Sequence, residues 1–183
     1  SDLKEIAADQ DWMKATNTVG VFSDDIRNTL KSGFPNEGTA AFITGGAKNL
    51  EGLFKTIKAQ PSNFEADAPG DVVQYIAAHD NLTLHDVIAK SINKDPKVAE
   101  EEIHKRIRLG NTMILTAQGT AFIHSGQEYG RTKQLLNPDY KTKVSDDKVP
   151  NKATLIDAVA KYPYFIHDSY DSSDAVNHFD WAK

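Results

Sequence analysis

The sequence predicts an α/β fold built on a parallel sheet. Short apolar runs alternate with stretches of helical periodicity, and each apolar run is continuous, as in parallel strands that are covered on both faces. Of the 183 residues, 39% are hydrophobic and 26% are charged, which suits one domain with one core. Every apolar run ends in polar side chains, and in such folds ligands bind at the carboxyl ends of the strands.

The first strand and helix are predicted in "VGVFSDDIRNTLKSG". Val19 to Phe22 is the apolar run, Ser23 or Asp24 can cap the helix that follows, and Gly33 can end it. A second helix is predicted in "GGAKNLEGLFKTIKAQP", where apolar residues recur at helical spacing between a glycine pair and a proline.

Two further strands are predicted in "DVVQYIAA" and "TAFIHSG". Between them, "LTLHDVIAKSI" has Thr83 as a candidate helix N-cap. The stretch "DPKVAEEEIHKRIRLGNTMILTAQG" predicts a long helix that opens with Asp95 before Pro96 and closes at Gly119. Beyond Tyr129 the pattern becomes irregular, and a loop of mixed charge with two prolines is predicted.

Charge and composition exclude several classes of protein. The formal net charge is −5 with basic residues scattered among acids, so no nucleic-acid footprint is predicted and neutral or weakly polar ligands are expected. The absence of cysteine excludes disulfides and thiolate zinc sites. No run approaches the roughly 18 apolar residues that a membrane span needs, and no signal peptide opens the sequence. We therefore expect a mature or excised chain without a membrane span.

The densest polar group follows the second strand, in "YIAAHDNLTLHD". His79, Asp80 and Asn81 stand where the apolar run stops, which predicts that they line a cleft shared by the strand ends. Alternatively, Asp80 only begins the turn into the next helix, because Asp, Asn and Thr favour such positions. His79 and His85 are six residues apart, not the four that place a zinc-binding pair on one helical face, so no metal site is predicted.

Other polar residues also have structural interpretations. Asp24 suits a helix N-terminus and Arg27 a solvated ion pair. His85 lies within a helical segment, where a histidine is usually structural. His124 ends the third strand, and its role is left open.

Four motifs, in this order, resemble type I pullulanases of the α-amylase superfamily of glycoside hydrolases (family 13). "VGVFSDDIRNTLKSG" is similar to their sixth-strand segment, "YIAAHDNLTLHD" to the seventh-strand motif, "TAFIHSGQEYGRTK" to the eighth strand with its loop, and "SYDSSDAVNHFDW" to a loop that borders the substrate cleft. Asn81 after Asp80 and the segment "GQEYGRTK" favour a resemblance to pullulanases over one to isoamylase-like debranching enzymes.

The resemblance implies a partial TIM (β/α)8 barrel, roughly strands 6 to 8 with their helices and a long loop after strand 8. Residues 1–183 would then be the C-terminal fragment of a catalytic domain, a single incomplete domain, because a whole barrel needs about 250 residues. The motifs of the fourth and fifth strands, which carry the aspartate nucleophile and the glutamic acid, are not found in this sequence.

The resemblance also implies roles for individual residues. Asp80 matches the catalytic carboxylate that stabilises the transition state of a retaining mechanism, and His79 matches a histidine that hydrogen-bonds the same sugar. Glu128 and Lys133 either reach the substrate or tie down the loop that holds them. The residues predicted to bind substrate are His79, Asn81, Arg131, Tyr170 and Asp174; weaker candidates are Tyr162, Tyr164, Phe165 and Asn177, the aromatic run being more often packing.

The implied activity of the parent enzyme is hydrolysis of α-1,6-glucosidic branch linkages in pullulan, glycogen or starch, and the fragment alone is predicted to be inactive. Its partners would be the α-glucan substrate and the remaining barrel segments or another copy of the chain. No cofactor is predicted, although some relatives bind calcium. The resemblance places the protein outside the cell or on the surface of a Gram-positive bacterium. The alternative is a non-catalytic carbohydrate-binding α/β module with the Tyr170 region as its platform.

Overall fold

A three-stranded parallel sheet forms where the sequence predicts it. The computed structural model describes residues 9–16, 18–47, 49–150, 153–156 and 160–183. Strands β1 (Val21–Phe22), β2 (Val72–Gln74) and β3 (Thr120–Ala121) lie in the order β1-β2-β3, and both pairings are parallel. The prediction of a parallel sheet is confirmed, with strands shorter than the apolar runs.

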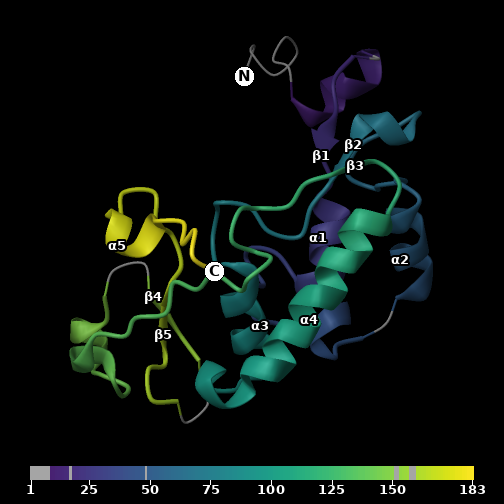
Figure 1. The fold of residues 1–183 in the computed structure, drawn as a ribbon. Helices are drawn as coiled ribbons and strands as arrows, with labels where there is room; N and C mark the ends of the chain where they lie inside the picture. The colour runs from purple at the N-terminus through teal and green to yellow at the C-terminus, as the bar shows by residue number, and fades with distance from the viewer. Residues whose placement is uncertain (1–8, 17, 48, 151–152, 157–159) are drawn as a thin grey trace.

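Helices gather on one side of this sheet (Figure 1). Helix α3 packs against α4, and α1 packs against α2. The side-chain amide of Gln74 in β2 donates to the carbonyls of Thr56, at the end of α2, and Gln118, just after α4, at 2.7 and 2.8 Å. The helices are α1 (Asp24–Lys31), α2 (Leu50–Ile57), α3 (Leu84–Ile92) and α4 (Pro96–Thr116), with short 3-10 turns at Gln10–Ala15, Phe42–Thr44 and Pro69–Asp71.

The predicted helix starts are confirmed, and one predicted end is wrong. Thr83 and Asp95 cap α3 and α4 through their side chains. Helix α1 ends at Lys31, with Ser32 as C-cap and Gly33 next, where a helix-ending glycine is expected. Helix α4 stops at Thr116 because the next residue is already extended toward β3. Gly119 instead precedes β3 and lies close to β2, because a Cβ added to Gly119 would lie 2.7 Å from the Val72 carbonyl oxygen.

The main core lies among the helices and the chain just after β2, and a smaller cluster of Met13, Ala59 and Phe64 packs with Val72 of β2. Gly110 lets α4 approach the chain after β2, since a Cβ there would lie 2.8 Å from the Ile76 side chain. Ile76, Leu82, Val87, Ile103 and Ile107 are all fully buried in the main core.

One face of the sheet is not covered as predicted. Val72 and Gln74, which point to one face, are buried, whereas Phe22, which is in register with Val73 on the other face, is 42% exposed. The edge strand β3 exposes both of its residues. Phe22 meets Tyr75 and Phe122 edge-on, with ring centroids 5.1 and 5.3 Å apart. Continuous apolar strands predict two covered faces, but the described residues supply a cover for only one. No closed barrel forms within the described part of the chain.

The segment after Tyr129 is more regular than predicted. Strands β4 (Ala153–Leu155) and β5 (Tyr164–Ile166) form an antiparallel pair, which lies apart from the three-stranded sheet in Figure 1. Tyr164 and Phe165 are buried, which confirms the packing interpretation for these two aromatic residues. The remaining elements are 3-10 turns at Pro138–Tyr140 and Asp146–Lys148 and the short helix α5 (Asp174–Asn177).

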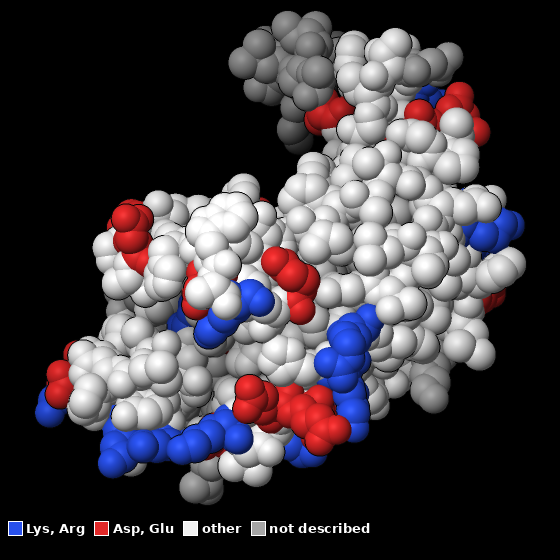
Figure 2. All heavy atoms as spheres, viewed as in Figure 1, with Lys and Arg blue, Asp and Glu red and all other residues white. Residues whose placement is uncertain are grey.

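Acidic and basic side chains lie next to one another over α4, on the face drawn in Figure 2. Glu102 pairs with Arg106 at 2.8 Å and with Lys94 at 2.5 Å, and Glu101 pairs with Lys105 at 2.7 Å. None of the helices in the described ranges has the length and apolar character needed to cross a membrane.

Candidate active site

The loop after β2 presents two polar side chains between two buried anchors. Ala77 is buried, and Leu82 is buried again just before α3. Between them, the side chains of His79 and Asp80 are 76% and 55% exposed. Asn81 takes a left-handed backbone conformation with φ of 61°, which asparagine tolerates better than most residues. This turn returns the chain to the core and leaves His79 and Asp80 at the surface.

Asp80 is held by two aromatic side chains. The Tyr170 hydroxyl donates to Oδ1 of Asp80 at 2.6 Å, and Nε2 of His79 lies 3.2 Å from the same oxygen. The rings of His79 and Tyr170 meet edge-on, with centroids 6.0 Å apart. The hydrogen bond to Asp80 raises the pKa of Tyr170 to about 12, because a neighbouring carboxylate disfavours the phenolate. Tyr170 is 62% exposed, so a ligand can reach this group.

A cleft of about 390 Å³ opens beside this group. Its walls come from the ends of β2 and β3 and from the segment 169–179, which the fold brings together from distant parts of the sequence. Among the predicted site residues, His79, Arg131 and Tyr170 line it, and Asp80, Asn81 and Asp174 do not. Asp80 lies at the edge of the cleft, in contact with the lining residues Tyr170 and His79. The lining residues are His79, His124, Ser125, Arg131, Ser169, Tyr170, Asn177 and Phe179.

Four of these lining residues were not predicted to bind substrate. His124 and Ser125 directly follow the third apolar run, which is the same signal that identified His79. Ser169 and Phe179 lie in the motif "SYDSSDAVNHFDW", whose resemblance to a loop at the substrate cleft was the signal for this segment. Burial and the nearby Arg131 guanidinium lower the pKa of His124, which favours a neutral imidazole that can both donate and accept hydrogen bonds.

Several predicted site residues hold the loops of the cleft. The Arg131 guanidinium donates to the Val176 carbonyl at 3.0 Å, and the Glu128 carboxylate accepts from the Gly126 amide at 2.9 Å. Asn177 donates through its side chain to the carbonyls of Ser169 and Ser172 at 2.7 and 3.1 Å. Asp174 begins α5, and its carbonyl accepts from the His178 amide at 3.0 Å. A substrate contact for Asp174 and for Asn81 stays a prediction.

The end of β1 carries a separate polar cluster. The Tyr75 hydroxyl donates to Asp24 at 2.8 Å, and Arg27 pairs with Asp24 at 3.1 Å. Burial and the hydrogen bond to Asp24 raise the pKa of Tyr75. None of these three residues lines the cleft, and the partners of Asp24 are Tyr75 and Arg27 instead of a lining residue, so the geometry favours the structural interpretation of Asp24 and Arg27.

Within the described ranges, no three His, Asp or Glu side chains gather as potential metal ligands. The cleft instead offers imidazole, hydroxyl, amide and guanidinium groups beside one exposed carboxylate. Such groups form hydrogen bonds to neutral polar ligands, and the aromatic rings of Tyr170 and Phe179 offer apolar faces. The absence of a cofactor stays a prediction for the complete protein, some of whose relatives bind calcium.

Comparison with known proteins shows the family of this chain. No model of a protein family matches the chain. Pullulanase A of Streptococcus pneumoniae is 70% identical over 183 residues, covering 97% of this chain and 14% of the relative. The chain belongs to the pullulanase family, as a segment. A Bacillus subtilis pullulanase is 28% identical over 170 residues, covering 90% of this chain and 19% of the relative. The chain thus spans less than a fifth of the length of either curated relative.

Solved pullulanase structures share this fold. The crystal structure of the Group B Streptococcus pullulanase SAP is 86% identical with a TM-score of 0.92, covering 96% of this chain and 23% of that one. The same pullulanase has been solved in complex with maltotetraose, with a TM-score of 0.91. The catalytic module of the pneumococcal protein SpuA, solved with an inhibitor, is 69% identical with a TM-score of 0.91, covering 96% of this chain and 26% of that module.

Proposed function

We propose that this chain supplies one part of the active site of a debranching glycoside hydrolase, which cleaves α-1,6-glucosidic linkages in pullulan, glycogen or starch. The observation that carries the proposal is the exposed Asp80 carboxylate, fixed by Tyr170 and His79 beside a polar cleft. An 86% identical pullulanase was solved with maltotetraose, which supports an α-glucan as the ligand.

Asp80 would act on the charge and hydroxyls of the bound sugar. A retaining glycosidase passes through a transition state that resembles an oxocarbenium ion, and a fixed carboxylate stabilises that developing positive charge. The hydrogen bond from Tyr170 orients one carboxylate oxygen, so that the other can accept hydrogen bonds from sugar hydroxyls. The nucleophile and the general acid would come from other segments of the complete enzyme.

The exposed face of the sheet supports a larger barrel. Strands β1 and β3 are the edges of the sheet, and unpaired edges favour association with further strands. The half-exposed Phe22 and its aromatic neighbours lie on the face that lacks a cover. We propose that the remaining barrel segments pair with both edges and that the chain alone is inactive. A location outside the cell or on its surface stays part of the proposal.

The first test substitutes Asp80 in the full-length enzyme. We expect Asp80→Ala to lower kcat on pullulan by about 10²–10³-fold, the loss typical for one preorganised electrostatic contact. The matched control is Asp139→Ala, because Asp139 lies in an exposed 3-10 turn outside the cleft. Release of reducing sugar is the readout. Equal activity of the two variants would exclude the role proposed for Asp80.

A second test separates this function from a carbohydrate-binding module. Tyr170 and Trp181 are 62% and 90% exposed, which favours an aromatic platform that binds sugar without catalysis. We expect residues 1–183 alone to show no binding of maltotetraose in titration calorimetry and no release of reducing sugar. Saturable binding without hydrolysis would support the binding module, and hydrolysis by this chain alone would contradict the incomplete site.

A further inference from the structure

A buried amino group lies behind the exposed pair of Asp80 and Tyr170. The side chain of Lys133, which is only 4% exposed, donates to the carbonyls of Asn81 and His167 at 2.7 and 2.8 Å. Its third contact is the Ser169 hydroxyl at 3.4 Å. A lysine ammonium has three N–H donors and no acceptor, so these contacts use its full hydrogen-bonding capacity.

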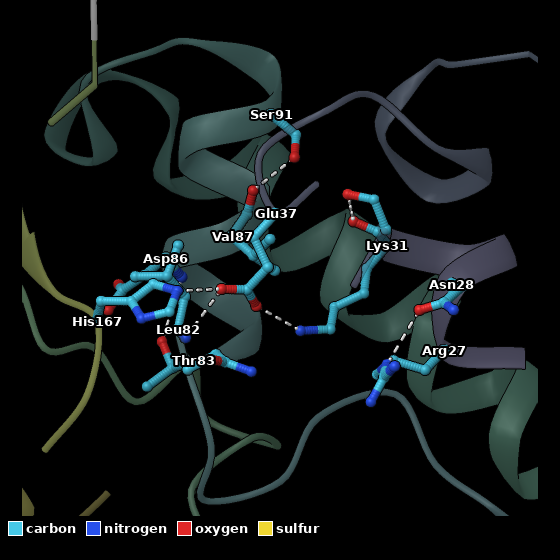
Figure 3. A network of polar contacts seen from close by, with 12 residues as sticks. Arg27, Asn28, Lys31, Glu37, Leu82, Thr83, Asp86, Val87, Ser91 and His167 are labelled. Atoms are coloured by element: carbon cyan, nitrogen blue, oxygen red, sulfur yellow. Dashed lines mark hydrogen bonds and ion pairs between the residues drawn. The ribbon is translucent and has the colours of Figure 1, made fainter. Parts of the chain in front are cut away.

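A buried carboxylate, that of Glu37, contacts the same two segments as Lys133 (Figure 3). Glu37, with a side chain 5% exposed, pairs with Lys31 of α1 at 2.9 Å. It also pairs with Nε2 of His167 at 2.9 Å and accepts a long hydrogen bond from the Leu82 amide at 3.4 Å. Figure 3 shows Glu37 between these partners, with His167 on one side and Lys31 on the other.

Both buried groups join the same two segments. Asn81 and Leu82 directly follow Asp80, and His167 and Ser169 directly precede the region of Tyr170. Lys133 holds the backbone of residue 167, and Glu37 holds its ring. The loop of Asp80 is therefore tied twice to the segment of Tyr170, and the hydrogen bond between these two side chains spans the same gap on the exposed side.

Stability alone does not require ionisable side chains at these buried positions. Burying ionisable groups costs free energy that their pairing often only offsets, and apolar side chains of similar volume are frequently as stabilising. Burial lowers the pKa of both Lys133 and Lys31, which is the physical sign of that cost. What polar groups add is direction, because hydrogen bonds fix the distance and angle between two segments.

We propose that Lys133 and Glu37 are positioning residues that hold Asp80 in register with Tyr170 at the edge of the cleft. The expected loss of activity on removing these residues rests on the proposed debranching function. The expected change in the contact between Asp80 and Tyr170 does not.

The test is Lys133→Met, which keeps most of the side-chain volume and removes the amino group. Its matched control is Lys90→Met, because the Lys90 amino group donates to Thr154 in the hairpin β4/β5 and not to the Asp80 loop. In the full-length enzyme we expect Lys133→Met to lower kcat by an amount on the order of 10²-fold with a smaller change in KM, as for other misplaced catalytic groups. Lys90→Met should keep the activity of the unsubstituted enzyme.

A second measurement reports on the hydrogen bond between Asp80 and Tyr170 and does not depend on enzymatic activity. The pKa of Tyr170, raised to about 12 by its hydrogen bond to Asp80, can be measured by NMR of ring-labelled tyrosine. We expect Lys133→Met to lower it toward the ordinary value of about 10, and Lys90→Met to leave it unchanged. An unchanged Tyr170 titration in folded Lys133→Met would overturn the proposal. Loss of activity in Asp80→Ala is tested separately, so failure of the proposed function would still leave this titration decisive.

His167 provides a variant from the Glu37 side if Lys133→Met does not fold. His167→Phe removes the donor to Glu37 but keeps a ring beside Phe34, whose centroid lies 6.4 Å from that of His167. His167→Gln can restore the donor, because its amide nitrogen reaches a position similar to Nε2. We expect the phenylalanine variant to lower the Tyr170 pKa and kcat, and the glutamine variant to recover both. Equal values for the two variants would contradict the proposal.

Discussion

The same dipeptide occurs twice in "YIAAHDNLTLHD" and adopts two different environments. His79 and Asp80 are exposed at the end of a strand, with Asp80 bonded to Tyr170. His85 and Asp86 lie in the first turn of α3, where Asp86 is 0% exposed. Residue type alone therefore does not distinguish a functional carboxylate from a structural one, whereas its place relative to the strand end and the helix cap does.

The buried carboxylate is fully engaged by neighbouring donors. Asp86 accepts from the Lys133 amide at 2.7 Å and from the Thr132 hydroxyl at 2.5 Å, and Nδ1 of His85 lies 2.8 Å from it. It thereby fastens the loop after β3 to the start of α3. The exposed carboxylate of Asp80 has donors on one side only and faces the solvent beside the cleft. The difference suits anchoring for Asp86 and ligand contact for Asp80.

The largest expected effect comes from removing the buried carboxylate. Asp86→Ala leaves the buried Lys133 amide and the Thr132 hydroxyl without their acceptor, and removing one partner of such a buried network costs about 3 kcal/mol in the free energy of unfolding. Denaturation in urea measures this value. Asp86→Asn, which keeps an acceptor oxygen, should cost less. If Asp86→Ala were as stable as the unsubstituted chain, the anchoring role would be wrong.

The parallel sheet and the starts of α3 and α4 were predictable because local chemistry determines them. Continuous apolar runs indicate parallel strands, and Thr83 and Asp95 act as caps within a few residues of their helices. The hairpin β4/β5 was missed because its strands are three residues each and pair across an irregular segment. Short pairings of this kind leave a weak periodic signal.

The candidate site was predictable at the strand ends and, through the family resemblance, at Arg131 and Tyr170, but the contacts that join its parts were not. Asp80 and His79 stand out as polar residues at the end of an apolar run, but their bond to Tyr170 joins positions 90 residues apart. The structural role of Lys133 was equally hidden, because its partners come from the loop of Asn81 and from the segment of His167 and Ser169. Contacts between distant segments depend on the complete fold and are not visible in local sequence.

A smaller effect is expected at the cap between the two dipeptides. The Thr83 side chain accepts from the Asp86 amide at 3.2 Å, and loss of such a cap costs about 1 kcal/mol. Thr83→Ala should lower the free energy of unfolding by this amount. The control is Thr112→Ala, because the Thr112 hydroxyl donates to the Arg108 carbonyl inside α4, and such a bond adds little to helix stability. Equal losses for both variants would contradict the capping role.

The smallest effect on stability is expected at the exposed dipeptide, where the change should instead appear in a titration. Asp80→Asn should alter the free energy of unfolding by less than about 0.5 kcal/mol, as surface substitutions usually do. Removing the negative charge should lower the Tyr170 pKa from about 12 toward about 10.

The raised pKa of Tyr170 determines how the contribution of this side chain to the stability of the fold depends on pH. A tyrosine whose pKa is raised by folding contributes stability that is complete below its unfolded pKa of about 10, and this contribution is lost as the pH rises through about 12. Asp80→Asn should remove this alkaline dependence at Tyr170, while the Tyr75 pKa stays raised through burial and Asp24. If Asp80→Asn lowered the pKa of Tyr75 as much as that of Tyr170, the effect of Asp80 would not be local to Tyr170. A response confined to Tyr170 supports a local, solvent-facing pair, which is what a ligand-binding carboxylate requires.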